Sequence, residues 1–278
     1  YKENCLAIEL IYTHKFLGTD KRKRRIMDES SVVLPYPNMV TDFLKLCQLG
    51  NLKNLKNIVY PVEPLGDEED EEEEEVLDAE KEPAIDVNML DEKQMPGICL
   101  AARSGHAKVV DFLIEAHCDI EMAAPGGLRA IHHSCNSIQE ACLRSLVNAG
   151  AEVNSKDDNG NTPLFWAASR GVLANAQILL QANGDKTAVN NNGDTLLHRS
   201  AANGHVMMCK FWVNKCELDV NAQNSIGDTP LHLAVKAGLV QIVNILLETN
   251  ADKSIKNKEG MIAAEYGSMH VNIMKALA

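Results

Sequence analysis

One short pattern recurs along this chain at an almost constant spacing, and it constrains the fold more than any other feature. Equivalent helix starts fall at residues 96, 129, 162, 195, 229 and 262, so the successive gaps are 33, 33, 33, 34 and 33 residues. A fixed period of this length predicts a stack of similar units in which each unit contacts mainly its neighbours. The chain is therefore expected to form an elongated array.

Each unit carries the signals of a first short helix. The clearest copies read Gly-Asn-Thr-Pro-Leu-Phe, Gly-Asp-Thr-Leu-Leu-His and Gly-Asp-Thr-Pro-Leu-His around Thr162, Thr195 and Thr229, and a glycine follows each threonine by nine residues. Threonine caps helix N-termini, proline is tolerated at the first helical position, and glycine ends helices in left-handed geometry.

A second helical pattern follows each glycine. Apolar residues recur there at helical spacing, which predicts one buried stripe for each helix. The stripes comprise Val109, Val110, Leu113 and Ile114, then Met208, Cys209, Trp212 and Val213, and then Ile242, Val243, Leu246 and Leu247. Turn residues such as Asp158-Asn159-Gly160 then lead into the next unit and predict a hairpin-like finger.

These motifs resemble those of the ankyrin-repeat family, whose unit is a turn plus two antiparallel helices of about 33 residues with the sequence Thr-Pro-Leu-His. The resemblance covers residues 41–278. It implies an all-α solenoid of about seven stacked helix pairs with β-hairpin-like fingers. The edge units are degenerate: Thr41 to Val59 is expected to form the first cap, and Ile262 replaces threonine in the last unit.

The net charge of −12 is concentrated in one segment. Residues 61–93 hold 16 acids and two lysines, a local balance of −14, so the remaining chain carries +2. Asp67 to Glu75 is an unbroken run of nine carboxylates, which repel one another and bury no apolar surface, and this predicts a disordered insertion at about residues 61–84. Three interpretations stay open: a docking tail for a basic partner, a mimic of nucleic acid that shields another basic surface, and a solvated loop without a dedicated ligand.

The register places this insertion inside the first unit. Gly50 and Gly105 are 55 residues apart, which is 22 more than one repeat. The acidic segment is therefore expected to leave the chain after the second helix of the first cap and to return before the finger at Ile85 to Asn88. Long loops are tolerated because the entropy of loop closure grows slowly with length.

Residues 1–40 are expected to form an N-terminal apolar helix and a basic linker. Asn4 to Leu17 is apolar but too short to span a bilayer, and three interpretations stay open: packing on the first cap, insertion into another subunit, and contact with a membrane. A basic cluster follows at Lys21, Arg22, Lys23, Arg24 and Arg25, which suits a nuclear-import signal, a phosphate-binding patch or an exposed linker. Tyr1 is not an initiator methionine, which suggests an excerpt of a longer polypeptide.

The cysteines and histidines follow the repeat and do not form a catalytic or metal motif. Eight cysteines occur without a Cys-x-x-Cys pair or an N-glycosylation acceptor, which favours a reducing, cytoplasmic or nuclear location. His132, His133 and Cys135 form the densest local cluster, but metal coordination needs three or four converging side chains. No phosphate loop, nucleophile elbow or His-Glu-x-x-His helix is present. We expect no cofactor and no enzymatic activity.

The resemblance implies a partner-binding surface made by the first helices and the fingertips. Trp166 and Arg199 stand where Leu100 and Leu233 follow the Thr-Pro-Leu-His position, and tryptophan and arginine are enriched at binding hot spots. We expect the centre of the footprint at Trp166, Arg170 and Arg199, while the alternative for Trp166 is simple packing between repeats. The further predicted contacts are Asn203, Lys236, Arg103, Asp157, Asp158, Asn161, Asn191, Asp194 and Asp228.

Three classes of function follow. The first is a non-enzymatic scaffold or adaptor subunit that binds one or more proteins. The second is a regulatory ankyrin domain of a larger enzyme or membrane protein. The third is a chromatin or nucleic-acid-associated regulator that uses the basic cluster, although the acidic tract would repel phosphates. The resemblance also implies that Asn88, Asn154 and Asn221 match places that an asparaginyl hydroxylase can modify.

Overall fold

The computed structural model describes residues 39–60, 83–136, 140–266 and 271–277, and these form seven antiparallel helix pairs. The first helices, called the inner helices below, are α2 (Met39–Leu49), α4 (Gly97–Ser104), α6 (Ala130–Ser134), α8 (Pro163–Arg170), α10 (Leu196–Ala202), α12 (Pro230–Lys236) and α14 (Ala263–Tyr266). The second helices, called the outer helices, are α3 (Leu52–Val59), α5 (Ala107–Glu115), α7 (Ala141–Asn148), α9 (Leu173–Gln181), α11 (Val206–Asn214), α13 (Val240–Glu248) and α15 (Val271–Leu277).

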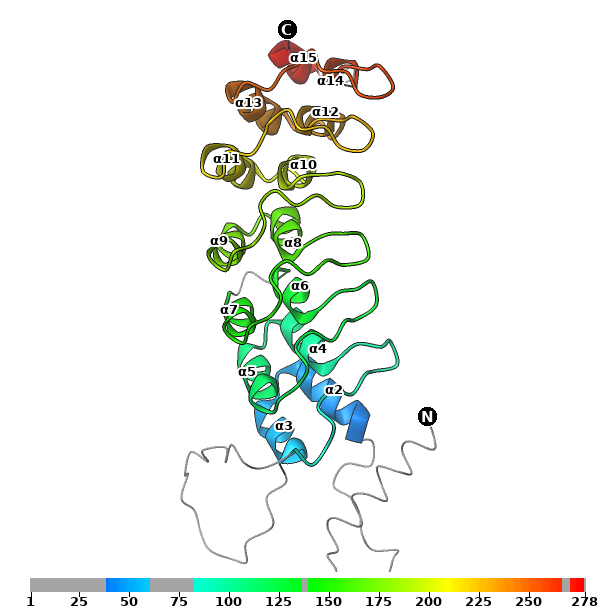
Figure 1. Cartoon of the computed structure of the whole chain (residues 1–278), viewed down its shortest axis with the longest axis vertical. Helices are drawn as coiled ribbons and strands as arrows, with labels where there is room; N and C mark the ends of the chain where they lie inside the picture. The colour runs from blue at the N-terminus through cyan, green and yellow to red at the C-terminus, as the bar shows by residue number, and fades with distance from the viewer. Residues whose placement is uncertain (1–38, 61–82, 137–139, 267–270, 278) are drawn as a thin grey trace, which may run out of the picture.

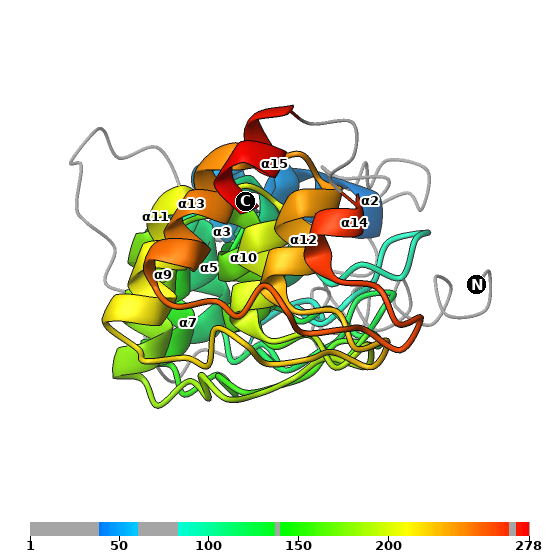
Figure 2. The same ribbon diagram turned by 90° about the horizontal axis from the view of Figure 1, so that it is seen from above.

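The pairs stack in one column. Figure 1 shows the inner helices between the outer helices and a set of fingers that all project to the same side. Seen from above, the two rows of helices lie side by side and the fingers extend along one flank (Figure 2). This arrangement confirms the predicted all-α solenoid, and the described fingers contain only isolated β-bridges, such as Ala124 with Leu128.

The predicted threonine caps form where a histidine lies three residues further on. The Oγ1 atoms of Thr195 and Thr229 accept the N–H groups of His198 and His232, each at 3.4 Å. Thr162 also occupies the N-cap, but its hydroxyl is buried without a hydrogen-bond partner. Phe165 stands in the histidine position of that repeat, so the side chain that would bond to the hydroxyl is missing.

Glycine ends the helices as predicted. Gly171 follows α8 with φ +73°, a left-handed conformation in which a side chain is strained. Space is also short, because a Cβ atom on Gly171 would lie 2.5 Å from Nδ1 of His205. The histidine that follows the next glycine therefore packs directly on this turn.

A continuous hydrophobic core runs along the stack between the inner and outer rows. The predicted stripes are buried at their first three positions, as in Ile242, Val243 and Leu246, while the fourth position, such as Leu247, is half-buried. Trp212 is the largest fully buried side chain, and its Nε1 donates to Oγ of Ser200 at 2.9 Å. Each unit thus buries its apolar surface against its neighbours, as expected of a solenoid.

The fingers are joined to one another by a ladder of side-chain amides. In five of the six described fingers an Asp or Asn accepts two backbone N–H groups of its own turn, as Asn190 does from Asn192 and Asp194, and the finger before α6 has Ala124 at this place. The Nδ2 group of Asn190 then donates to Oδ1 of Asn161 in the preceding finger at 3.2 Å. The same step joins Asn224 to Asp194 and Asn257 to Asp228. The ladder holds neighbouring fingers in a fixed register.

The first unit begins the described part of the stack. In the first unit α2 begins at Met39, and the backbone N–H of Ala84 donates to the carbonyl oxygen of Val59 at 2.8 Å. The chain therefore re-enters the fold directly beside the end of α3. The predicted apolar helix, the basic cluster and the run of carboxylates lie outside the described residues.

The third unit departs furthest from the repeat. Its inner helix α6 has only five residues. Arg129 replaces threonine at the helix start, and its Nη1 atom lies 2.6 Å from Glu121 and 2.5 Å from Glu152. This ion-paired triad joins the two fingers on either side of α6.

Candidate partner-binding surface

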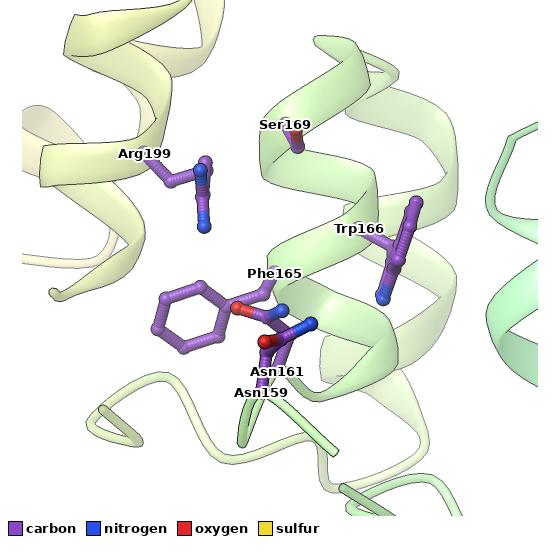
Figure 3. Close-up of a pocket in the computed structure, with 6 residues that line it drawn as sticks. All are labelled: Asn159, Asn161, Phe165, Trp166, Ser169 and Arg199. Atoms are coloured by element: carbon purple, nitrogen blue, oxygen red, sulfur yellow. The ribbon is translucent and has the colours of Figure 1, made fainter. Parts of the chain in front are cut away.

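The inner helices and the fingers meet at a pocket between the fourth and fifth units. The pocket has a volume of about 170 Å³ and is lined by Asn159, Asn161, Phe165, Trp166, Ser169 and Arg199. Arg199 reaches from α10 toward α8, Phe165 projects from α8 toward α10, and Trp166 lies on the other flank of α8 (Figure 3). Two of the three residues predicted at the centre of the footprint thus line one hollow.

Trp166 has a structural role as well as an exposed face. Its side chain is half-buried, and Nε1 donates to Oδ2 of Asp157 at 3.1 Å. The other carboxylate oxygen of Asp157 accepts the N–H groups of Asn159 and Asn161 and so closes the turn of the finger. Trp166 therefore braces the finger beside the pocket that it lines.

Other predicted helix contacts are exposed, and several of them also join adjacent repeats. Nε of Arg170 donates to Oδ1 of Asn136 at 2.7 Å, and Nδ2 of Asn203 donates to the carbonyl and hydroxyl oxygens of Ser169. Nζ of Lys236 lies 5.3 Å from the centre of the Tyr266 ring, which suits a cation–π contact. Arg103, at the end of α4, is also exposed.

The predicted finger contacts need a correction. Asp157, Asn161 and Asp228 are buried, with Asp228 fully so, and their side chains point into the finger ladder. Asp157 and Asp228 therefore present little surface to a partner, whereas Asn161 also lines the pocket. Asp194 is half-buried and accepts Nδ2 of Asn224, whereas Asp158 and Asn191 remain exposed.

Comparisons with known proteins identify the family. A sequence profile described as ankyrin repeats (three copies) matches residues 98–190 and 173–257, which together make up more than half of the chain. The chain belongs to the ankyrin-repeat family. It is 30% identical to the ankyrin repeat protein YahD of Escherichia coli over 171 residues, which are 60% of this chain and 85% of YahD.

Other ankyrin-repeat relatives are much longer. Over 127 residues, or 45% of this chain, it is 31% identical to human transient receptor potential cation channel subfamily A member 1, of which it spans only 11%. Among solved structures, the ankyrin repeat domain of Bcl-3 superposes with a TM-score of 0.64 and 22% identity, covering 84% of this chain and 96% of that domain. This last likeness concerns the fold alone.

The histidines at the fourth position of the Thr-Pro-Leu-His sequence join adjacent units through hydrogen bonds. Nε2 of His132 lies 3.1 Å from the carbonyl oxygen of Ser155, and Nε2 of His232 lies 3.1 Å from that of Met261. Burial lowers the pKa of His132 and His198, which favours the neutral ring. Among the described residues, no group of three or more His, Cys, Asp or Glu side chains is placed to hold a metal ion.

The cysteines behave as small buried side chains. All seven that the structure describes are buried and unpaired with one another. Burial raises the pKa of the Cys47, Cys99 and Cys135 thiols to about 12, so they carry no nucleophilic thiolate near neutral pH. In the parts of the chain that the structure describes, no helix is long and apolar enough to cross a membrane.

Two further histidines, which the sequence analysis did not single out, also join adjacent repeats. Nε2 of His106 lies 3.0 Å from the carbonyl oxygen of Gln48, and Nε2 of His205 lies 2.7 Å from that of Ser169. Both follow a helix-ending glycine directly, so the Gly-His pair is a sequence signal that could have found them.

The predicted modification sites also have structural roles, since the Oδ1 atoms of Asn88, Asn154 and Asn221 each accept a backbone N–H of the next finger.

Proposed function

We propose that this chain is a non-enzymatic scaffold or adaptor that holds a partner protein against its inner helices and fingers. Ankyrin repeats generally act as protein–protein interaction modules. The observation that carries the proposal is the pocket between α8 and α10, where Trp166 and Arg199 present the side chains most typical of binding hot spots. The finger ladder supports it, because a rigid wall loses little conformational entropy on binding.

The footprint is proposed to centre on Trp166, Arg170 and Arg199. Its outer contacts would be Arg103, Asn203, Lys236, Asp158 and Asn191, which are all exposed. A basic partner for the acidic segment remains a separate proposal. The match to a small part of a human cation channel supports the alternative of a regulatory ankyrin region within a larger protein.

The test is affinity purification with the full chain and two matched double variants. Arg170→Ala with Arg199→Ala changes the inner face, while Lys108→Ala with Lys210→Ala removes two exposed cations from α5 and α11. We expect the inner variant to lose a set of captured proteins that the outer variant retains. Capture of the same proteins by both variants, at unchanged melting temperature, would contradict the proposed surface.

A further inference from the structure

Charge is distributed one-sidedly along the inner helices. Between Gly97 and Lys236 the five inner helices α4, α6, α8, α10 and α12 contain four cations and no Asp or Glu. The cations are Arg103, Arg170, Arg199 and Lys236. Three of them are exposed, and Arg199 is half-buried at the pocket. Glu265 on the short terminal helix α14 is the first carboxylate on an inner helix beyond this row.

None of these four cations is ion-paired within the described part of the chain, where the ion pairs involve Arg129 and Arg144. The neighbouring fingers also carry carboxylates, of which Asp157 and Asp228 are buried in the ladder and Asp194 is half-buried. On the finger before α8, Asp158 is exposed, and so is Glu152, which pairs with Arg129. The inner face therefore presents a row of positive charge that a partner can meet.

The guanidinium of Arg170 is held so that it can bind a carboxylate. Its Nε donates to Asn136, which fixes the plane of the group and leaves the two terminal nitrogens for a ligand. A planar guanidinium can form two parallel hydrogen bonds to one carboxylate. Arg199 offers the same group beside the aromatic side chains of the pocket.

We propose that the inner face of α4 to α12 binds an extended acidic segment of a partner protein. This proposal rests on the proposed function and specifies the chemistry of the partner. Packed helices lie about 8–10 Å apart, and an extended chain advances about 3.3 Å per residue. A carboxylate at about every third residue of the partner would therefore meet one inner helix after another. Arg103, Arg170, Arg199 and Lys236 supply the cations, and Asn136 supplies an amide in the third unit.

The experiment measures fluorescence anisotropy of labelled decaglutamate, decaglutamine and a single-stranded DNA of similar charge. Two quadruple variants of the full chain are compared with the parent. The inner variant carries Arg103→Gln, Arg170→Gln, Arg199→Gln and Lys236→Gln. The control carries Lys53→Gln, Lys108→Gln, Lys210→Gln and Lys215→Gln, which are exposed on or beside the outer helices. A fourth protein has the carboxylates of Asp67 to Glu75 replaced by amides.

We expect the parent to bind decaglutamate and not decaglutamine, with affinity that weakens as salt shortens the Debye length from its value of about 10 Å at 0.1 M. The inner variant should bind at least about tenfold more weakly, and the control should stay within about twofold. Circular dichroism of each variant checks that the helices are retained.

Four results would overturn the proposal. They are equal weakening in both quadruple variants, tighter binding of DNA than of decaglutamate, no binding by any protein, and binding only by the amide-substituted chain. Binding only by the amide-substituted chain would mean that the carboxylates of Asp67 to Glu75 themselves occupy the inner face. If decaglutamate fails while the inner-face variants still lose captured proteins, the proposed function stands and only the acidic character of the partner is wrong.

Discussion

His198 and Asp228 join two neighbouring repeats through a buried hydrogen bond between Nε2 and the carbonyl oxygen, 2.9 Å apart. Nδ1 of His198 accepts the backbone N–H of Thr195, so the network places the ring proton on Nε2. One neutral histidine thus accepts the backbone N–H at the helix start of its own repeat and donates to a backbone carbonyl in the finger of the next repeat.

Replacing this ring should destabilise the stack. In His198→Leu the carbonyl of Asp228 and the N–H of Thr195 lose their partner in a buried site, so we expect the free energy of unfolding to fall by about 1–3 kcal/mol. Urea denaturation followed by circular dichroism measures the change. Lys210→Leu, at an exposed position of α11, is the control and should change the midpoint little. An equal effect of both substitutions would argue against the stitching role.

His133 should make stability depend on pH. Burial, followed by the charges of Arg103 and His132, lowers the pKa of His133 from 6.5 to about 4. Because the folded chain favours the neutral ring, this stability is fully present above pH 6.5 and is lost as the pH falls toward 4.

The matched variant is His133→Leu, since leucine occupies the same place at Leu100 and Leu233. Between pH 7 and pH 5 we expect the parent chain to lose about 2 kcal/mol more free energy of unfolding than this variant. Urea denaturation at the two pH values gives the comparison. Identical losses would show that His133 does not titrate in this range.

The threonine caps predict a contrast between two identical substitutions. Thr195→Val removes a hydroxyl that bonds to His198, and it should cost about 1 kcal/mol. Thr162→Val replaces a buried hydroxyl that has no partner, so it should be neutral or stabilising. Thermal melting of the two variants decides the matter, and a larger loss at Thr162 would contradict the account.

Substitutions at Trp166 and Arg199 should show which of the two residues holds the finger in place. Trp166→Phe removes the hydrogen bond to Asp157, and we expect amide exchange at Asn159 and Asn161 to become about fivefold faster, as for a loss of about 1 kcal/mol. Arg199 has no hydrogen bond to Asp157 in the structure, so Arg199→Ala should leave this amide exchange unchanged. Faster exchange in the Arg199 variant as well would mean that the arginine also holds the finger.

Most of the fold was predictable because the signals that start and end each helix act locally. Thr195 and Thr229 cap their helices, and the apolar stripes lie in the core as their helical spacing predicts. The short α6 was harder to predict, since Arg129 replaces the cap residue and compensates through ion pairs with two other fingers.

The site was predicted only in part. Trp166 and Arg199 were found because they break a leucine position, and both line the pocket. Asp157 and Asp228 were predicted to contact a partner, but both are buried in the ladder. An acidic residue in a turn can face solvent or accept N–H groups of the fingers, as Asp157 does from its own backbone turn and Asp228 does from Nδ2 of Asn257. The ladder has a sequence signal, since Asn190 and Asn257 each follow their acceptor in the preceding finger by 29 residues.

The most direct test of the central claim is amide hydrogen exchange of the full chain with and without a captured partner protein. The account predicts protection of α8, α10 and the intervening finger around Asn190 and Asn191, with α9 and α11 unchanged. Protection confined to the outer helices, or spread evenly over both rows, would contradict an inner-face binding surface.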